Sequence, residues 1–531
     1  MRRFKVSTVL GLVLLAFFSA CTTEKEESSE KPNVLILFSD QHKKDVMGFE
    51  EHPDVITPNL DDFAEESLVF DRAYATVGIC VPSRTSFVTG MMPRTLGVLS
   101  NPDRTSVVDE MVPMASIFKS NGYKTFAFGK RHLYQAADDG WDVKKDHAYK
   151  PDDDDNYVSW IERNGYAEEF AHDWAAEFGR GPRGSSEFET EIPTADLGTR
   201  ISQLPEDYTM EAYTARETIK MIKEQAKNDE PFFCWANFYR PHQPYTPLKR
   251  YMDMYDVSEW GDGTKNGGAI KKPENFYEPT ENLPPLLQSQ RNGGNKVWNM
   301  DKAFEDEQIW REYIGAYYAL VTEMDHHIGE ILEAVEDAGI EDETIVMYIS
   351  DHGDFVGSHG MVEKCAAGQN VYEDILNVPL IVKIPKKTTD GKRTAELVTL
   401  ADVLPTLIDL LDLEVPETKY SIQGKSLADL ILKNESLDRE FVVSESWAQA
   451  SIITDRYKLG MMLDPHNVHK NQDYRDFGDM FFDMEKDPLE VENKINDPKY
   501  QQEISRLRMY FDEFVKDIPS TGKEELIEEN K

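Results

Sequence analysis

Five runs of apolar, often β-branched residues are bounded by polar or glycine-containing segments, a pattern typical of buried β-strands. Within these runs apolar residues do not alternate with polar ones, so both faces of each strand are predicted to be covered. The pattern therefore predicts a sheet that lies between two layers of helices. The predicted strands are 33–38, 123–128, 232–238, 344–349 and 378–384.

Segments with apolar residues at helical spacing lie between these strands. Alternation of strands with helices is typical of α/β folds, in which the helices connect neighbouring parallel strands. We therefore expect a large mixed, mostly parallel sheet sandwiched by helices. The predicted helices are 59–67, 113–121, 210–227, 310–338 and 401–411.

The pattern changes near residue 440, where short strand-like pieces follow one another and precede one amphipathic segment. We predict a main domain over 33–435 and a smaller C-terminal α+β subdomain over 436–531, with an antiparallel sheet and a helix. Two polar stretches, 138–205 and 252–305, lack clear periodicity and are predicted to be loops over the ligand-binding edge of the sheet. The C-terminal pieces are strands 441–446, 450–454, 457–462 and 480–483 and helix 501–515.

The N-terminus has the pattern of an export signal. Three basic residues precede an apolar run over 6–20, which is shorter than the roughly 20 residues that a membrane-spanning helix needs. This run ends in Phe-Ser-Ala-Cys21, which resembles a bacterial lipobox. We expect a signal peptide over 1–20, a lipid on Cys21 and a polar tether over 21–32 that holds the exported protein on a bacterial membrane, at the cell surface or in the periplasm. An ordinary secretory signal with an incidental cysteine is the alternative.

Charge and cysteine content limit the function classes. The 531 residues carry a formal net charge of −40, which opposes binding to nucleic acid through its phosphates. The charge does not exclude an anionic substrate, because a metal ion and a few basic side chains can reverse the potential inside a cleft. Four cysteines in a chain of this size do not make a disulfide framework, and a bridge between Cys234 and Cys365 stays open.

Polar, ligand-type residues follow four of the predicted strands immediately. Because ligands bind at the carboxyl ends of strands in open α/β sheets, these residues are expected to form one site. They are Asp40-Gln41, Lys130-Arg131-His132, Arg240-Pro241-His242 and Asp351-His352.

The segment Cys80-Val-Pro-Ser-Arg84 is the most specific local signal. It resembles the C-x-P-S-R signature of the type I sulfatases, members of the alkaline phosphatase superfamily. The resemblance implies that a formylglycine-generating maturation enzyme oxidises Cys80 to formylglycine. A hydrated aldehyde offers two hydroxyls, one to attack sulfur and one to expel the sulfate afterwards. A cysteine that is merely buried is the structural alternative.

Further segments resemble the same family and occur in the family's order along the chain. They imply an alkaline phosphatase-like fold and a sulfatase similar to arylsulfatases or iduronate-2-sulfatases. Arg131 stands where the family usually has an aromatic residue, and it is interpreted either as a substrate contact or as a solvated side chain. The matching segments are 33–41, 57–61, 129–132, 240–244, 344–353, 457–459 and 482–488.

The resemblance also implies a metal site made by Asp40, Gln41, Asp351 and His352 together with residue 80. Their mostly oxygen donors suit a hard cation, so Ca²⁺ is expected. Gln41 and His352 replace the acid or asparagine of other members, which leaves Mg²⁺ or Mn²⁺ open. A loop histidine that caps the next turn is the alternative for His352.

Five further residues receive catalytic roles from the resemblance. Arg84 is expected to hold the deprotonated hydroxyl, and Lys130 to stabilise the sulfate oxygens. His132 would orient or deprotonate a hydroxyl, and His242 would protonate the leaving alcohol. Lys364 is the candidate for a second sulfate-binding lysine, although it precedes Tyr372-Glu373 by more than the family's usual spacing.

We therefore expect a lipid-anchored sulfuric ester hydrolase that removes sulfate from a sulfated carbohydrate. A phosphonate monoester or phosphodiester hydrolase, or a choline-sulfatase-like enzyme, is the alternative within the superfamily. A non-catalytic glycan-binding protein is the alternative from another class, and an unmodified Cys80 in the native organism would favour it.

Overall fold

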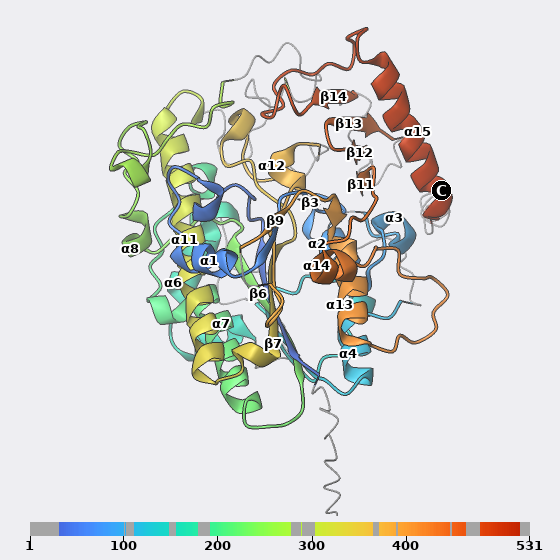
Figure 1. Cartoon of the computed structure of the whole chain (residues 1–531). Coiled ribbons are helices and arrows are strands. Elements are labelled where there is room, and N and C mark those ends of the chain that lie inside the picture. The colour runs from blue at the N-terminus through green and yellow to red at the C-terminus, as the bar shows by residue number, and fades with distance from the viewer. Residues whose placement is uncertain are drawn as a thin grey trace, which may run out of the picture. The chain divides into compact units, whose positions relative to one another are not determined.

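The computed structural model places the predicted sheet at the centre of the main domain (Figure 1). Predictions about the signal peptide, Cys21 and Cys365 fall outside the residues that it describes. Within those residues, no helix combines the length and the apolar character needed to cross a membrane. The structure describes residues 31–99, 101, 111–147, 156–178, 192–277, 288, 303–364, 371–388, 391–446, 449–463 and 478–520.

The main sheet has eight strands in the order β5-β4-β6-β1-β7-β8-β2-β9. The run from β5 to β7 is parallel throughout, whereas β8 pairs antiparallel with both of its neighbours. This arrangement confirms the prediction of a mixed, mostly parallel sheet. The strands are β1 (Asn33–Asp40), β2 (Leu68–Phe70), β4 (Lys124–Gly129), β5 (Val143–Lys145), β6 (Phe232–Pro241), β7 (Thr344–Ser350), β8 (Leu380–Lys383) and β9 (Arg393–Thr394).

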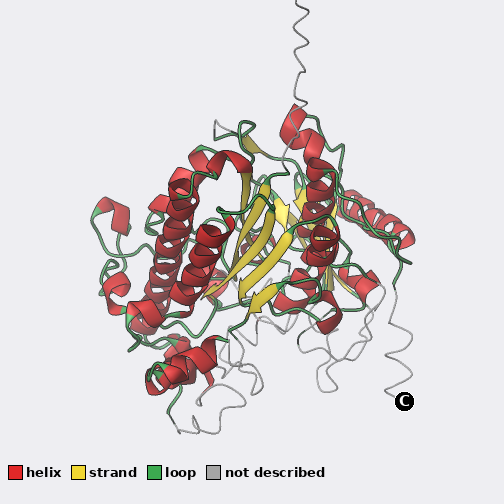
Figure 2. Cartoon of the chain, turned by 90° about the horizontal axis from the view of Figure 1, so that it is seen from below, coloured by secondary structure: helices red, strands yellow, loops and turns green. Residues whose placement is uncertain are grey.

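Helices cover both faces of this sheet, as the view from below shows (Figure 2). In β1, Val34 and Ile36 belong to the hydrophobic core on one face, while Leu35 and Leu37 belong to the core on the other. Alternate side chains of a strand point to opposite faces, so a continuous apolar run fills both cores. The longer helices are α1 (Pro58–Glu65), α2 (Cys80–Thr89), α4 (Met114–Ser120), α5 (Tyr157–Arg163), α6 (Ala167–Phe178), α7 (Met210–Gln225), α11 (Glu307–Asp337) and α13 (Val403–Leu411).

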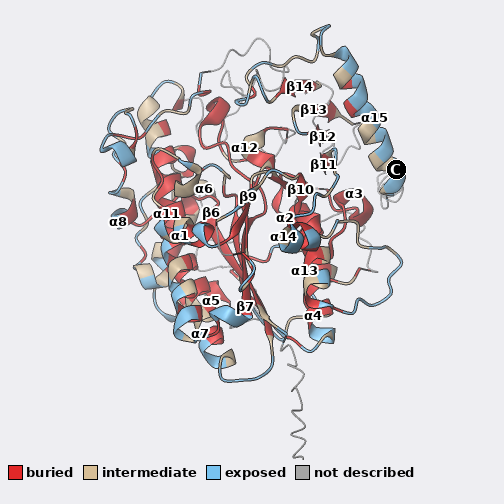
Figure 3. Ribbon diagram, in the orientation of Figure 1, coloured by how far each residue is buried: buried red, intermediate tan, exposed pale blue. Residues whose placement is uncertain are grey.

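A second, antiparallel sheet of four strands forms the C-terminal part, with the order β11-β12-β13-β14. Helix α15 (Gln501–Asp517) packs on it through Ile504 and Leu507, whereas most of its outer face is exposed (Figure 3). Two segments of the main domain contact this sheet. Glu373 in α12 (Glu373–Leu376) pairs with Lys458 of the sheet, and the carbonyl of Thr76, in the loop before α2, accepts a hydrogen bond from the backbone of Glu445. The strands are β11 (Val442–Glu445), β12 (Gln449–Ile453), β13 (Tyr457–Met462) and β14 (Met480–Asp483).

The prediction that 138–205 is a loop was wrong in part, because this stretch contains β5, α5 and α6. Strand β5 is short and mostly exposed, so it has no apolar run to reveal it. Helices α5 and α6 pack aromatic and aliphatic residues into a small separate core. The polar residues around them concealed the helical spacing.

Removing the buried ammonium of Lys458 should destabilise the fold. Lys458 lies fully buried in β13, 2.8 Å from a carboxylate oxygen of Glu373 in α12 and 2.5 Å from one of Glu490. Lys458→Met would leave two acids without their cation, so we expect the free energy of unfolding to fall by about 3 kcal/mol. Urea unfolding measures this, with Lys433→Met at an exposed helix position as the matched control. Equal midpoints for the two variants would contradict the prediction.

Candidate active site

Four neighbouring strands deliver the predicted site residues to one edge of the main sheet. Strands β4, β6, β1 and β7 are adjacent and parallel, so their carboxyl ends lie side by side. Lys130 follows β4, His242 follows β6, Asp40 ends β1 and Asp351 follows β7. The parallel order therefore brings together residues that are up to 311 positions apart in the sequence.

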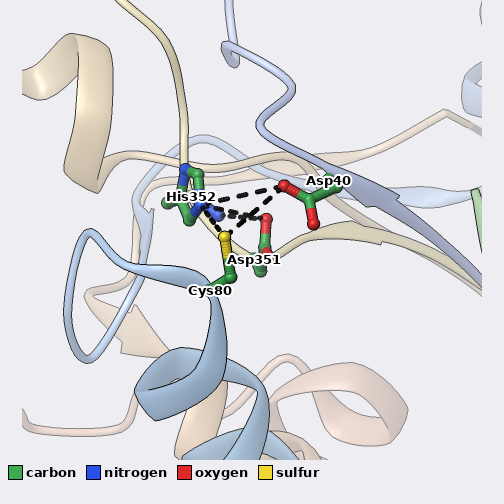
Figure 4. A group of neighbouring side chains, drawn as sticks. All are labelled: Asp40, Cys80, Asp351 and His352. Carbon is green, nitrogen blue, oxygen red and sulfur yellow. Dashed lines mark hydrogen bonds and ion pairs between the residues drawn. The ribbon is translucent and has the colours of Figure 1, made fainter. Parts of the chain in front are cut away.

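Asp40, Cys80, Asp351 and His352 form a compact buried cluster (Figure 4). One ligand atom from each lies within 4.8 Å of the others, and none of the four is more than 1% exposed. The Cys80 sulfur lies 3.2 Å from Nε2 of His352 and 3.8 Å from a carboxylate oxygen of Asp40. Cys80 is the first residue of α2, where the helix dipole favours a negative group.

Arg84 fixes the two carboxylates of this cluster from one side. Its Nε donates to Asp351 at 2.7 Å and one terminal nitrogen donates to Asp40 at 3.0 Å, with all three side chains fully buried. The other terminal nitrogen donates to the backbone oxygen of Lys130 and to the side-chain oxygen of Asn237. Charge-assisted bonds of this kind hold both partners in one geometry.

Cationic groups surround Cys80 on its other sides. Burial by itself would raise the pKa of the Cys80 thiol, but Lys364, Lys130 and His352 hold that pKa well below its usual value. The Lys130 ammonium lies 2.7 Å from Asp40, while Nε2 of His242 lies 4.0 Å from the same carboxylate. The cluster is thus suited to an anion at position 80 and to a bound anionic group.

The positions of His132 and His242 differ in exposure. His132 is exposed, yet its hydrogen bond to Cys80 is one cause of the lowered thiol pKa. His242 is 9% exposed, and its Nδ1 donates to the carbonyl of Gln243 at 2.7 Å, so its Nε2 faces the cluster. Burial and then Lys130 lower the pKa of His242. The site therefore opens to solvent on the side of His132.

The cluster fits a divalent cation. Nδ1 of His352 donates to the carbonyl of Gly353 at 2.9 Å, which leaves Nε2 free to act as a ligand toward the two aspartates. Burial lowers the pKa of His352, but Asp351 and Cys80 more than offset this and raise it to about 9. These groups thus concentrate negative charge where a cation would be bound. Asp40, Cys80, Asp351 and His352 are the residues that could hold it.

Gln41 has contacts unlike those of the other predicted ligands. Its amide oxygen accepts from the Lys364 ammonium at 2.8 Å, and its amide nitrogen donates to Asp354 at 2.6 Å. Lys364 is buried and also pairs with Glu363 at 2.7 Å. The structure therefore brings Lys364 into the site, despite its spacing in the sequence.

Sequence reasoning missed Asp354 and Asn237. Asp354 is fully buried and accepts hydrogen bonds from Gln41 and from the hydroxyls of Tyr245 and Tyr313, both at 2.9 Å. Asn237 is a polar residue inside the apolar run of β6, and this break in the pattern is the signal that could have found it. Both residues orient groups that touch the cluster.

Arg131 fits neither of its predicted interpretations. Its side chain is buried and pairs with Asp138 at 2.8 Å and with Asp146 at 3.1 Å. It therefore ties the segment after β4 to the following loop, which holds the neighbouring Lys130 and His132 in position.

Comparisons with known proteins agree with this geometry. The profile of the sulfatase family matches residues 32–413, and that of the N-sulphoglucosamine sulphohydrolase C-terminal region matches residues 357–517. An arylsulfatase of Clostridium perfringens is 28% identical over 90% of this chain and 93% of its own. A Δ4,5-hexuronate-2-O-sulfatase of Bacteroides thetaiotaomicron is 26% identical over 92% of this chain and 90% of its own.

Among solved structures, a phosphonate monoester hydrolase of Agrobacterium radiobacter has a TM-score of 0.70 and 20% identity, covering 92% of this chain and 95% of its own. At this identity the likeness concerns the fold alone. The match of the family profile over most of the chain decides the classification. The chain belongs to the sulfatase family of sulfuric ester hydrolases.

Proposed function

We propose that this sulfatase removes sulfate from a sulfated carbohydrate, with formylglycine at position 80 as its nucleophile. The observation that carries the proposal is the place of Cys80, buried at the start of α2 among two carboxylates, an imidazole and two ammonium groups. The Δ4,5-hexuronate-2-O-sulfatase supports a carbohydrate substrate, because it resembles this chain over most of both lengths. A formylglycine-generating maturation enzyme is the implied partner.

The proposed roles follow from the geometry. Formylglycine would supply a hydrated aldehyde, whose hydroxyl attacks sulfur. Lys130 and Lys364 would bind the sulfate oxygens, because both ammonium groups lie close enough to Cys80 to lower the pKa of its thiol. Arg84 would keep Asp40 and Asp351 in place. His242 would give a proton to the leaving alcohol, and His132 would hold a hydroxyl of residue 80.

The proposed metal is Ca²⁺, held by Asp40, Asp351, His352 and residue 80, with Gln41 as a further ligand through the second lone pair of its amide oxygen. A bound cation would act as a Lewis acid that polarises the sulfate group. Mn²⁺ is one alternative, because it tolerates an imidazole donor better than Ca²⁺ does, and Mg²⁺ is another, because it needs fewer protein oxygens than Ca²⁺.

A phosphonate monoester or phosphodiester hydrolase is the second candidate. The fold shared with the phosphonate monoester hydrolase favours this candidate. Release of inorganic sulfate from a panel of sulfated saccharides, measured beside cleavage of a phosphodiester, separates the two. Faster cleavage of the phosphodiester than of every sulfate ester would favour the phosphonate monoester or phosphodiester hydrolase over the sulfatase.

Substitution of Cys80 tests the nucleophile. Cys80→Ala should lower the rate of sulfate release at least about 1,000-fold, because the attacking group is lost. The protein must be produced together with a formylglycine-generating enzyme, and mass spectrometry of the peptide that contains residue 80 reports the conversion. Cys234→Ala is the control, since this buried thiol lies in β6 outside the cluster. An unconverted Cys80 in a fully active enzyme would refute formylglycine as the nucleophile.

Removal of the metal tests the cluster. Treatment with a chelator should abolish sulfate release, and we expect Ca²⁺ to restore it more fully than Mg²⁺ or Mn²⁺ does. Asp351→Asn should weaken Ca²⁺ binding by about 10-fold or more, because it removes one anionic ligand. Calorimetric titration of the metal-free protein measures the affinity without reference to activity. Full activity after exhaustive chelation would argue against a required metal.

Anchoring through Cys21 is also proposed, on the lipobox-like sequence Phe-Ser-Ala-Cys21. In a bacterial host, the chain should incorporate radiolabelled palmitate and sediment with membranes, and Cys21→Ser should lose the palmitate. The apolar run over 6–20 is unchanged in this variant, so retained sedimentation would indicate that the uncleaved signal segment, and not a lipid, holds the protein.

A further inference from the structure

The site has two further glutamates, which Gln243 connects to it. The amide nitrogen of Gln243 donates to Glu363 at 2.7 Å and reaches a carboxylate oxygen of Glu177 at 3.5 Å. The amide oxygen of Gln243 accepts from Gln41, which touches Lys364. Glu177 comes from the last turn of α6, a helix that the sequence pattern did not reveal.

The two glutamates differ in how their charge is satisfied. Glu363 pairs with the Lys364 ammonium at 2.7 Å. Glu177 makes no ion pair within the described ranges, and its second carboxylate oxygen is buried without a hydrogen-bond partner there. Burial and then repulsion by Glu363 raise the pKa of Glu177 to about 8. Glu177 thus presents a hydrogen-bond acceptor that the described protein groups do not satisfy.

Glu177 lies near the cationic groups of the reaction centre. Asp40, Asp351 and Arg84 are fully buried at its closed side, so a substrate must enter past His132, which is exposed. The carboxyl group of Glu177 is close enough to Lys130 and Lys364 for both ammonium groups to lower its pKa in part.

One aromatic pair connects α6 to Lys130. The ring of Trp174 in α6 lies 6.0 Å from that of Tyr239, and the Lys130 ammonium lies 4.4 Å above the Tyr239 ring. The carboxyl group on α6 therefore lies near Lys130, one of the two ammonium groups that are proposed to bind the sulfate.

We propose that Glu177 binds a hydrogen-bond donor, a hydroxyl or an ammonium, on the alcohol part of the substrate and so selects sulfated sugars that carry one. This inference rests on the proposed function. A substrate without such a donor leaves a buried acceptor unpaired, and a site built for a hydrogen bond rejects analogues that cannot form it. Glu177 is then a specificity-determining residue.

Steady-state kinetics test the inference on the saccharide sulfate that the enzyme hydrolyses fastest. Glu177→Ala should raise KM for this saccharide about 10-fold or more. The inhibition constant of inorganic sulfate should stay the same, because sulfate has no alcohol part for Glu177 to bind. Glu177→Gln keeps an acceptor oxygen. A small rise in KM in this variant would identify the substrate donor as a hydroxyl, and a rise as large as that in Glu177→Ala would identify it as an ammonium.

Glu168→Gln, at an exposed position of the same helix, is the matched control and should change neither constant. A KM that stays unchanged in Glu177→Ala would overturn the inference. Parallel weakening of saccharide and sulfate binding in both Glu177 variants would also overturn it, because this result indicates damage to the sulfate site. Absence of sulfate release by the unsubstituted enzyme would instead refute the proposed function.

Discussion

The double ion pair of Arg84 with Asp40 and Asp351 is the interaction on which the site depends. Two carboxylates from adjacent strands converge on one edge of the sheet, fully removed from water, and they would repel each other without a cation between them. These ion pairs also fix α2, the helix that carries Arg84, against the edge of the sheet. Residues four positions apart lie on the same face of a helix. Cys80 is one turn before Arg84, so anchoring the guanidinium places the sulfur beside His352.

The surface and the site have opposite electrostatic requirements. The chain as a whole is strongly acidic, with a formal net charge of −40, whereas Lys130, Lys364 and Arg84 gather around Cys80. Bulk charge keeps such a protein soluble, but a few buried cations determine what a cleft attracts. An anionic sulfate ester is therefore compatible with an acidic protein.

The C-terminal subdomain supports the same centre from a distance. The backbone nitrogen of Glu445 in β11 donates to the carbonyl of Thr76, in the loop that leads to Cys80. Lys458 in β13 pairs with Glu373, which begins the short helix after the Lys364 segment. The small sheet thus positions two segments of the main domain that carry site residues.

The sequence by itself determined the class of the fold and most of the residues of the site. Apolar runs specify strands buried on both faces, and the rule that parallel strands present their carboxyl ends together placed Asp40, Lys130, His242 and Asp351 at one edge. Only the tertiary structure decided the burial of Arg131, the contacts of Gln41 and Lys364, and the place of Glu177. These features depend on contacts between residues far apart in the chain, and such contacts leave no local pattern of hydrophobicity or spacing.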